Sequence, residues 1–233
     1  MLTGKTNMKR MVFLSLLLLL ATTIGNAQEN SGIEVSVSSG IVLPSSPMTF
    51  ADYWNVQYGG GLRVGYPLSQ SMTLVGSVEH YQFKLNQDGV SKAFDTQYMR
   101  DIWVFTSVSL TPSADPTSVT TVSANLRMAP SKISGMLAPY FIGGIGVMRF
   151  SLGEIKLPTT SVLSASGSDI SMTAQQTITG GEQTSAFFQL GMGFDVHLTQ
   201  TFDLFVEARY ATGLTNGLHT AYVPITGGIK LRL

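Results

Sequence analysis

The sequence of 233 residues contains no cysteine, little charge and, beyond its N-terminus, no apolar run long enough to cross a membrane as a helix. The absence of cysteine excludes disulfides, thiolate metal sites and a cysteine nucleophile. Charged residues make up 12% of the chain and hydrophobic residues 44%. Its many apolar residues are therefore dispersed along the chain, which is typical of a β-rich protein.

The numbers of positive and negative charges are equal, which helps to predict the binding partners of the chain. The 14 basic and 14 acidic residues give a formal net charge of zero. No excess of basic residues provides a surface for phosphate backbones, so we expect no nucleic-acid partner. No spacing of His, Asp and Glu is typical of a metal site, and we expect no metal or cofactor.

The N-terminus has the pattern of an export signal. Lys9 and Arg10 precede the apolar run MVFLSLLLLLA, and Gly25-Asn26-Ala27 offers a small-x-small cleavage site. We expect residues 1–27 to be a signal peptide that is cleaved after Ala27, and residues 28–233 to be the mature domain. Cleavage would remove three basic residues and leave a net charge of about −3.

The clearest pattern in the mature chain is a period of two over residues 185–210, SAFFQLGMGFDVHLTQTFDLFVEARY. Apolar residues occupy alternate positions on both sides of Thr199-Gln200-Thr201, with Phe205 as the exception. Such a period indicates strands whose two faces meet different environments. Two such strands joined by a short polar turn predict a β-hairpin with long strands.

The same pattern along the chain predicts an all-β fold, an eight-stranded antiparallel transmembrane up-and-down β-barrel. The expected strands are residues 33–43, 56–66, 72–83, 118–128, 136–153, 185–198, 202–210 and 221–233. Short connections, at 67–71, 129–135 and 199–201, alternate with long or polar ones, at 44–54, 84–117, 154–184 and 215–218. Residues 101–110 also have the pattern of a strand, and we expect them in an extension or hairpin beyond the membrane.

Two further features follow from the alternation. Pairs of outward aromatic residues, Tyr58 with Tyr66, Phe202 with Tyr210 and Tyr140 with Phe150, have the spacing of two interfacial girdles. The opposite face carries charges of both signs, which must pair inside a barrel this narrow. The predicted interior charge network consists of Glu34, Arg63, Glu79, Arg127, Arg149, Asp195, Glu207, Arg209, Lys230 and Arg232.

The segments GGGLRVGYPLSQSMTLVGSVEH, VTTVSANLRMAP and APYFIGGIGVMRF, followed by a terminal strand, resemble the eight-stranded outer-membrane barrels of the OmpA/OmpX-like superfamily. The Tyr66-Pro67-Leu68 turn and the Pro-Tyr that precedes alternating glycines at 139–146 are the motifs that carry the resemblance. It covers roughly residues 33–233. It implies architecture and a location in the bacterial outer membrane more than a specific function.

We therefore expect an integral outer-membrane barrel with a structural, surface-exposed or narrow-channel role and an interior plugged by charged side chains. The expected partners are outer-membrane lipid or lipopolysaccharide, the outer-membrane insertion machinery and an extracellular ligand of the long loops. We do not expect an enzyme. A small-solute porin, a loop-mediated adhesin or ligand receptor, and an outer-leaflet lipid-modifying enzyme that uses His80 are the alternatives.

Overall fold

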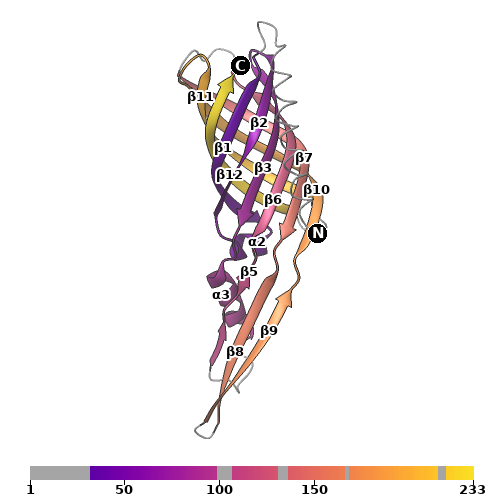
Figure 1. Cartoon of the computed structure of the whole chain (residues 1–233), viewed down its shortest axis with the longest axis vertical. Coiled ribbons are helices and arrows are strands. Elements are labelled where there is room, and N and C mark those ends of the chain that lie inside the picture. The colour runs from indigo at the N-terminus through magenta and orange to yellow at the C-terminus, as the bar shows by residue number, and fades with distance from the viewer. Residues whose placement is uncertain (1–31, 99–106, 131–135, 166–167, 215–218) are drawn as a thin grey trace, which may run out of the picture.

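The computed structural model describes residues 32–98, 107–130, 136–165, 168–214 and 219–233. The expected signal peptide, residues 1–27, lies outside these ranges. Within them, eight long strands form a closed barrel (Figure 1). The barrel strands are β1 (Glu34–Ser46), β2 (Gln57–Ser69), β3 (Met72–Phe83), β6 (Thr117–Met128), β7 (Leu137–Leu152), β10 (Gly181–His197), β11 (Phe202–Leu214) and β12 (His219–Arg232).

Every neighbouring pair of barrel strands is antiparallel, in the order β1-β12-β11-β10-β7-β6-β3-β2. Strands that follow one another in the barrel part of the chain are also neighbours in space, and β1 closes the barrel against β12. This is the predicted eight-stranded up-and-down barrel, and the fold prediction is confirmed. No helix among the described residues is long and apolar enough to cross a membrane.

The two faces of the barrel wall follow the alternation in the sequence. On β10, Leu190 and Met192 are 65% and 58% exposed on the outer surface, whereas Gln189 lies on the inner face and is 2% exposed. Exposed aromatic residues Tyr58, Tyr66, Phe202 and Tyr210 also lie on the outer surface, as expected for interfacial girdles. An apolar exterior around a polar interior is the arrangement that a membrane requires of a barrel.

Strand β7 is the exception, and its predicted orientation is wrong. Tyr140 and Met148 are buried inside the barrel, whereas Phe141 and Ile145 are exposed on its outer surface. Both faces of this strand carry large apolar residues, so the alternation alone does not distinguish them. Tyr140 and Phe150 therefore do not form a third girdle pair.

The long connections contain helices and a hairpin that were not expected from the sequence. Strand β1 continues to Ser46, and helix α2 (Met48–Tyr53) follows it. Helix α3 (Gln87–Tyr98) occupies part of the connection after β3. Within the long connection at 154–184, which is rich in Ser and Thr, the chain forms β8 (Ile155–Ala165) and β9 (Ser168–Ile178), an antiparallel hairpin. Ser and Thr residues can form a two-stranded ladder in water, because the backbone groups bond to each other and neither face of the hairpin has to be buried.

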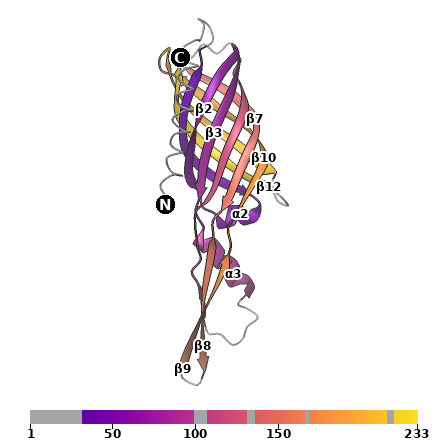
Figure 2. The ribbon, with the colours of Figure 1, turned by 45° about the vertical axis from the view of Figure 1, so that its right-hand side comes forward.

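The hairpin belongs to a small sheet outside the barrel. Strand β4 (Ser107–Leu110) and the two-residue strand β5 (Ser113–Ala114) both pair with β8. The first six residues of the expected strand 101–110 lie outside the described ranges, and its last four form β4. Figures 1 and 2 show this sheet with α2 and α3 at one end of the barrel, with the hairpin continuing along the long axis.

The other end of the barrel carries the short turns and the C-terminus (Figure 1). In the turn between β10 and β11, the Thr199 side-chain oxygen accepts hydrogen bonds from the backbone N–H groups of Thr201, at 3.2 Å, and Phe202, at 2.9 Å. A threonine that caps its own turn in this way fixes a tight reversal. Short and long connections are thus sorted to opposite ends, as outer-membrane barrels sort periplasmic turns from outer loops.

Candidate functional site

A ring of four charged side chains fills the middle of the barrel. Arg63 of β2 and Arg209 of β11 each contact both Glu79 of β3 and Glu207 of β11, and the four N–O distances lie between 2.7 and 3.0 Å. All four side chains are at most 5% exposed. Two cations and two anions leave the ring neutral, which is the condition for burying charge at a tolerable cost.

Polar and aromatic neighbours complete the ring. The hydroxyl of Tyr81 donates to Glu79 at 3.2 Å, and that of Tyr140 donates to Glu207 at 2.9 Å. Arg209 also donates to the Gln189 amide oxygen at 2.7 Å. The Nε atom of Arg209 lies 2.7 Å from Glu207 as an ion pair without the angle of a hydrogen bond. These partners hold each carboxylate in one orientation.

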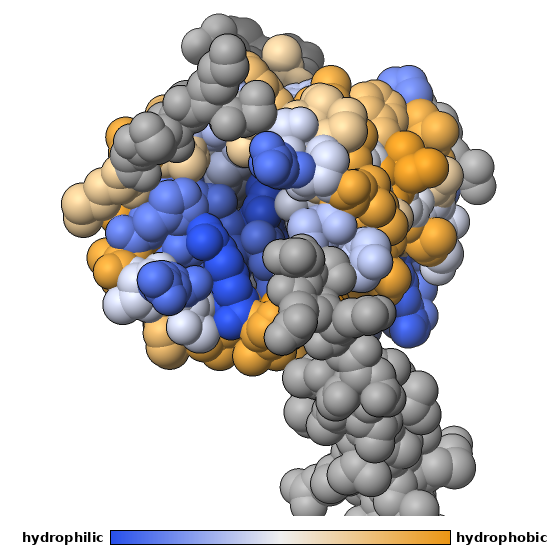
Figure 3. All heavy atoms as spheres, turned by 90° about the horizontal axis from the view of Figure 1, so that it is seen from above, coloured by the Kyte–Doolittle hydropathy of each residue, from blue (hydrophilic) through white to orange (hydrophobic). Residues whose placement is uncertain are grey.

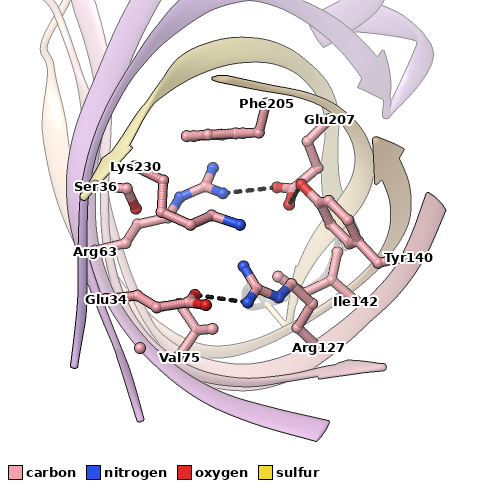
Figure 4. Close-up of a pocket in the computed structure, with 11 residues that line it drawn as sticks. Glu34, Ser36, Arg63, Val75, Arg127, Tyr140, Ile142, Phe205, Glu207 and Lys230 are labelled. Carbon is pink, nitrogen blue, oxygen red and sulfur yellow. Dashed lines mark hydrogen bonds and ion pairs between the residues drawn. The ribbon is translucent and has the colours of Figure 1, made fainter. Parts of the chain in front are cut away.

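A second charged group lies next to this ring. Figure 4 shows its members Glu34, Arg127 and Lys230 beside Arg63 and Glu207 of the ring. Arg127 of β6 donates to Glu34 of β1 at 2.6 Å and lies 3.8 Å from Asp195 of β10. Lys230 of β12 contacts the same Asp195 at 2.5 Å. The Tyr140 ring lies 5.6 Å from the Arg127 guanidinium and 5.9 Å from the Lys230 ammonium. This group is also neutral, so the interior is built as stacked, charge-balanced layers.

A third layer lies at the short-turn end. Asp203 is fully buried and accepts from Arg232 at 2.5 Å, and the His197 ring nitrogen lies 2.8 Å from the same carboxylate. The Arg232 side chain is 37% exposed, so this layer meets water. Asp203 was not among the predicted network residues. Its inward position in the alternation of β11 was the signal that could have identified it.

One member of the predicted network is misplaced. Arg149 points outward from β7, is 60% exposed, and pairs at 2.5 Å with Glu182, which is 57% exposed. Its assignment to the interior is wrong for the same reason as the assignment of Tyr140, because β7 has the opposite orientation. Sequence reasoning also missed Tyr81 and Phe205 as interior partners, whereas the alternation places Gln189 on the inner face, where it is buried. Phe205, the exception in the alternation, packs its ring 5.2 Å from the Arg63 guanidinium.

Two glycines make room for the central ring. A Cβ atom on Gly61 would lie 2.6 Å from Glu79 Cγ, and a Cβ atom on Gly191 would lie 2.5 Å from Arg209 Cγ. Each glycine lies directly across the strand pair from the charged residue, in the pairs Gly61–Glu79 and Gly191–Arg209. The long charged side chains therefore lie flat over the neighbouring backbone, where any other residue would obstruct them.

Toward the end with the long connections, the interior changes from charged to apolar. Helix α2 places Phe50 with its ring 5.0 Å from Phe83 and 6.0 Å from Phe150. Phe83 lies 6.4 Å from Tyr222, whose ring is 5.6 Å from Tyr81. The buried members of this aromatic plug are Val42, Phe50, Trp54, Tyr81, Phe83, Val119, Met148, Phe187, Ala211 and Tyr222. The plug closes the barrel a second time.

The cavities in the interior also differ between the middle of the barrel and its short-turn end. A space of about 20 Å³ remains between the two charged layers, room for about one water molecule. A larger cavity of about 430 Å³ opens at the short-turn end and is lined by polar residues that include Arg127, Asp195 and His197. Figure 3, viewed from that end, shows hydrophilic residues around a hollow and hydrophobic residues on the outer wall. Water therefore reaches the charged layers from the short-turn side.

The described ranges also bear on metal binding and on the lipid chemistry considered for His80. They contain no group of three or more His, Asp or Glu side chains that is suited to a metal ion. His80, the histidine considered for lipid chemistry, faces outward on β3, and its Nδ1 atom lies 2.8 Å from the Thr120 hydroxyl. His80 therefore lies outside the charged interior.

A closed antiparallel barrel with an apolar exterior and a charged, filled interior defines the class of small membrane β-barrels. Comparison with solved structures agrees with this class. A major outer membrane protein from Thermus thermophilus matches with a TM-score of 0.50 at 11% identity, over 88% of this chain and 100% of that one. An identity this low shows the fold alone. As a resemblance of fold, the predicted OmpA/OmpX-like resemblance is confirmed by the closed eight-stranded barrel.

Two other solved structures are similar at lower scores. Neisserial surface protein A matches at 14% identity and a TM-score of 0.44, over 88% of this chain and 100% of that one. The N-terminal β-barrel domain of Pseudomonas aeruginosa OprF matches at 15% identity and a TM-score of 0.41, over 88% of this chain and 98% of that one. No family model and no curated protein matches the sequence.

Proposed function

We propose that the protein is an outer-membrane surface protein whose closed barrel anchors an extracellular β-sheet projection that makes contacts outside the cell. In this proposal the chain is exported by the signal peptide and cleaved after Ala27. The insertion machinery of the outer membrane assembles it, and lipid and lipopolysaccharide surround the apolar wall. The long-connection end then faces outward and the short turns face the periplasm.

The observation that carries the proposal is the double closure of the interior. A solute that crossed the barrel would have to displace the central ring, in which each carboxylate contacts two guanidiniums. It would then have to part the aromatic plug, where Phe83 and Tyr222 are at most 2% exposed. Separating buried, paired charges costs several kcal/mol per ion, so the interior favours an anchor over a porin.

The second line of support is the amount of ordered structure beyond the barrel. In the described part of the chain, α2, α3, β4, β5, β8 and β9 lie outside the barrel strands, and β8 with β9 forms a ladder from Ile155–Ile178 to Ala165–Ser168. An ordered projection of about 35 Å, at ~3.3 Å per residue, presents backbone and side chains to another surface. This supports the adhesin or ligand-receptor alternative over a purely structural role.

The experiment combines conductance with binding. Full-length protein in planar bilayers should show no regular conductance steps, whereas steps of uniform size would favour the porin alternative. For the binding assay, a variant replaces residues 164–169 by Asn-Gly, which suits a two-residue hairpin turn. It keeps the hydrogen-bonded Leu163–Ile170 pair and every pair of β8 with β4. Cells with this variant should lose protein-dependent attachment to surfaces or other cells, while the barrel assembles normally; unchanged attachment would contradict the proposal.

A further inference from the structure

Strand β9 has one edge without a partner strand. On one side it pairs with β8 over its whole length, from Ser168 to Ile178. The opposite edge of β8 is taken by β4 and β5, and no strand in the described part of the chain pairs with the other edge of β9. Figure 1 shows β5 and α3 on one side of β8 and β9 on the other.

The hydrogen bonds of β8 identify which β9 residues face this open edge. Pro158 accepts a backbone hydrogen bond from Thr111 at 3.3 Å, on the side away from β9. The N–H and C=O of one strand residue point to the same side, and alternate residues point to opposite sides. Gln175, the partner of Pro158, therefore directs its backbone away from β8. By alternation, the residues whose backbone faces the open edge are Asp169, Ser171, Thr173, Gln175 and Thr177.

This edge lacks the features that keep other edge strands from pairing. Soluble β proteins protect an edge with lysine, proline, a bulge or a very short strand. Residues 157–181 contain one charged residue, Asp169, and β9 contains neither lysine nor proline. The β8–β9 register runs without a bulge. The strand is rich in Ser, Thr and Gln, so it stays hydrated while its backbone remains open to a partner.

We infer that β9 pairs antiparallel with β9 of a second copy of this protein. The inference rests on the proposed function and names the partner of the projection. Full overlap of the two strands centres the pairing on Thr173, which then lies opposite its own copy. In this register Asp169 lies opposite Thr177, so the single charge of the strand never meets its equivalent. Like charges directly opposite each other would destabilise the pair.

The direction of pairing determines where the second copy is. Two copies of one strand that pair antiparallel are related by a two-fold axis perpendicular to the strands. Because the β8–β9 hairpin continues along the long axis of the barrel, the two barrels then point in opposite directions (Figures 1 and 2). Two such barrels sit in two apposed membranes. Copies in one membrane would bring their β9 strands together in parallel.

A non-aggregating diderm host provides the test. Cells that express the full-length protein should clump with one another and not with cells that lack it. The double variant Thr173→Pro with Gln175→Pro removes two N–H groups from the open edge and leaves the β8–β9 ladder intact. It should reduce clumping to the level of cells without the protein. Thr173→Ala with Gln175→Ala, which keeps both N–H groups, should clump normally. Clumping that survives the proline changes would overturn the inference.

Because the chain contains no cysteine, single cysteines report the geometry directly. Cells with Asp169→Cys mixed with cells with Thr177→Cys should form disulfide-linked dimers on mild oxidation, since opposed strand residues lie within disulfide reach. Cells with Asp169→Cys alone should form few. Cross-linking of Asp169→Cys to itself in preference to Thr177→Cys would show parallel pairing and would overturn the inference.

The two proposals fail separately. Cells that attach to other surfaces through the hairpin, but neither clump nor cross-link, would refute pairing between copies and leave the proposed function intact. If cells with and without the shortened hairpin attach and clump alike, the proposed function fails, and the inference fails with it.

Discussion

Arg209 and Glu79 stand 130 positions apart in the sequence, and their side chains lie 2.7 Å apart at the centre of the barrel. Arg209 is on β11 and Glu79 on β3, strands that are not neighbours in the barrel wall. The ion pair therefore spans the interior rather than following the wall. The barrel is narrow enough for side chains from opposite strands to meet, and the central ring fills the middle of its interior.

Loss of one carboxylate from the ring should be costly. In Glu79→Gln, Arg63 and Arg209 keep their charges, and Glu207 alone faces both. Removing one partner of a buried ion pair costs about 3–5 kcal/mol of unfolding free energy. Urea unfolding in lipid vesicles measures it. The control is Glu182→Gln, whose exposed pair with Arg149 should contribute at most about 1 kcal/mol. Equal costs for the two variants would show that the ring does not stabilise the barrel.

The space left by glycine can be tested in the same assay. Gly191→Ala places a methyl group against Arg209 Cγ, so the guanidinium must move away from its carboxylates. We expect a loss of about 1–3 kcal/mol, typical of overpacking. Gly76→Ala is the matched control on an outward position, where a Cβ atom would meet only Val64 O at 3.9 Å. A neutral Gly191→Ala would argue against the packing described for Arg209.

The aromatic plug should contribute to stability independently of the charges. Phe83 is fully buried between Phe50 and Tyr222, so Phe83→Ala should cost about 3–5 kcal/mol. The control is Phe202→Ala, which removes a ring that is 45% exposed at the outer surface. Conductance of Phe83→Ala should remain absent, because the central ring still closes the barrel. Regular channels in this variant would locate the closure in the plug alone.

The outward position of Met192 makes a prediction about the membrane. A lysine there would face lipid near the middle of the wall and should cost about 2–4 kcal/mol in vesicles. Met192→Leu keeps the apolar surface and should be nearly neutral. The difference between the two variants should shrink in a detergent that lets water reach the wall. A neutral Met192→Lys in vesicles would contradict a lipid-facing position.

Export and cleavage can be checked by determining the N-terminal residue of the mature protein. Protein extracted from outer membranes should begin at Gln28, because the Gly25–Ala27 segment is the expected cleavage site. Mass spectrometry of the intact chain gives the result directly, including cyclisation of an N-terminal glutamine. A mature membrane protein that retains Met1 or Met8 would contradict the export signal.

The sequence by itself determined the eight barrel strands and the face of most of them. The reason is local, because a pleated strand sends successive side chains to opposite faces. Where one face meets lipid and the other meets a charged interior, apolar and polar residues alternate along the sequence. On β10 and β11 every predicted inward charge lies inside. Tight turns such as the one at Thr199 are likewise local, because the side chain that caps the turn belongs to it.

Only the tertiary structure decided the remaining features. The orientation of β7 depends on its register with β6 and β10, because large apolar residues on both faces make its alternation ambiguous. The same register excludes Arg149 from the interior. Helix α2 is held by packing of Phe50 on rings from β3 and β7 rather than by its own short sequence. The partners in the central ring follow from closure of the barrel, which brings β3 and β11 face to face across an interior that no local pattern describes.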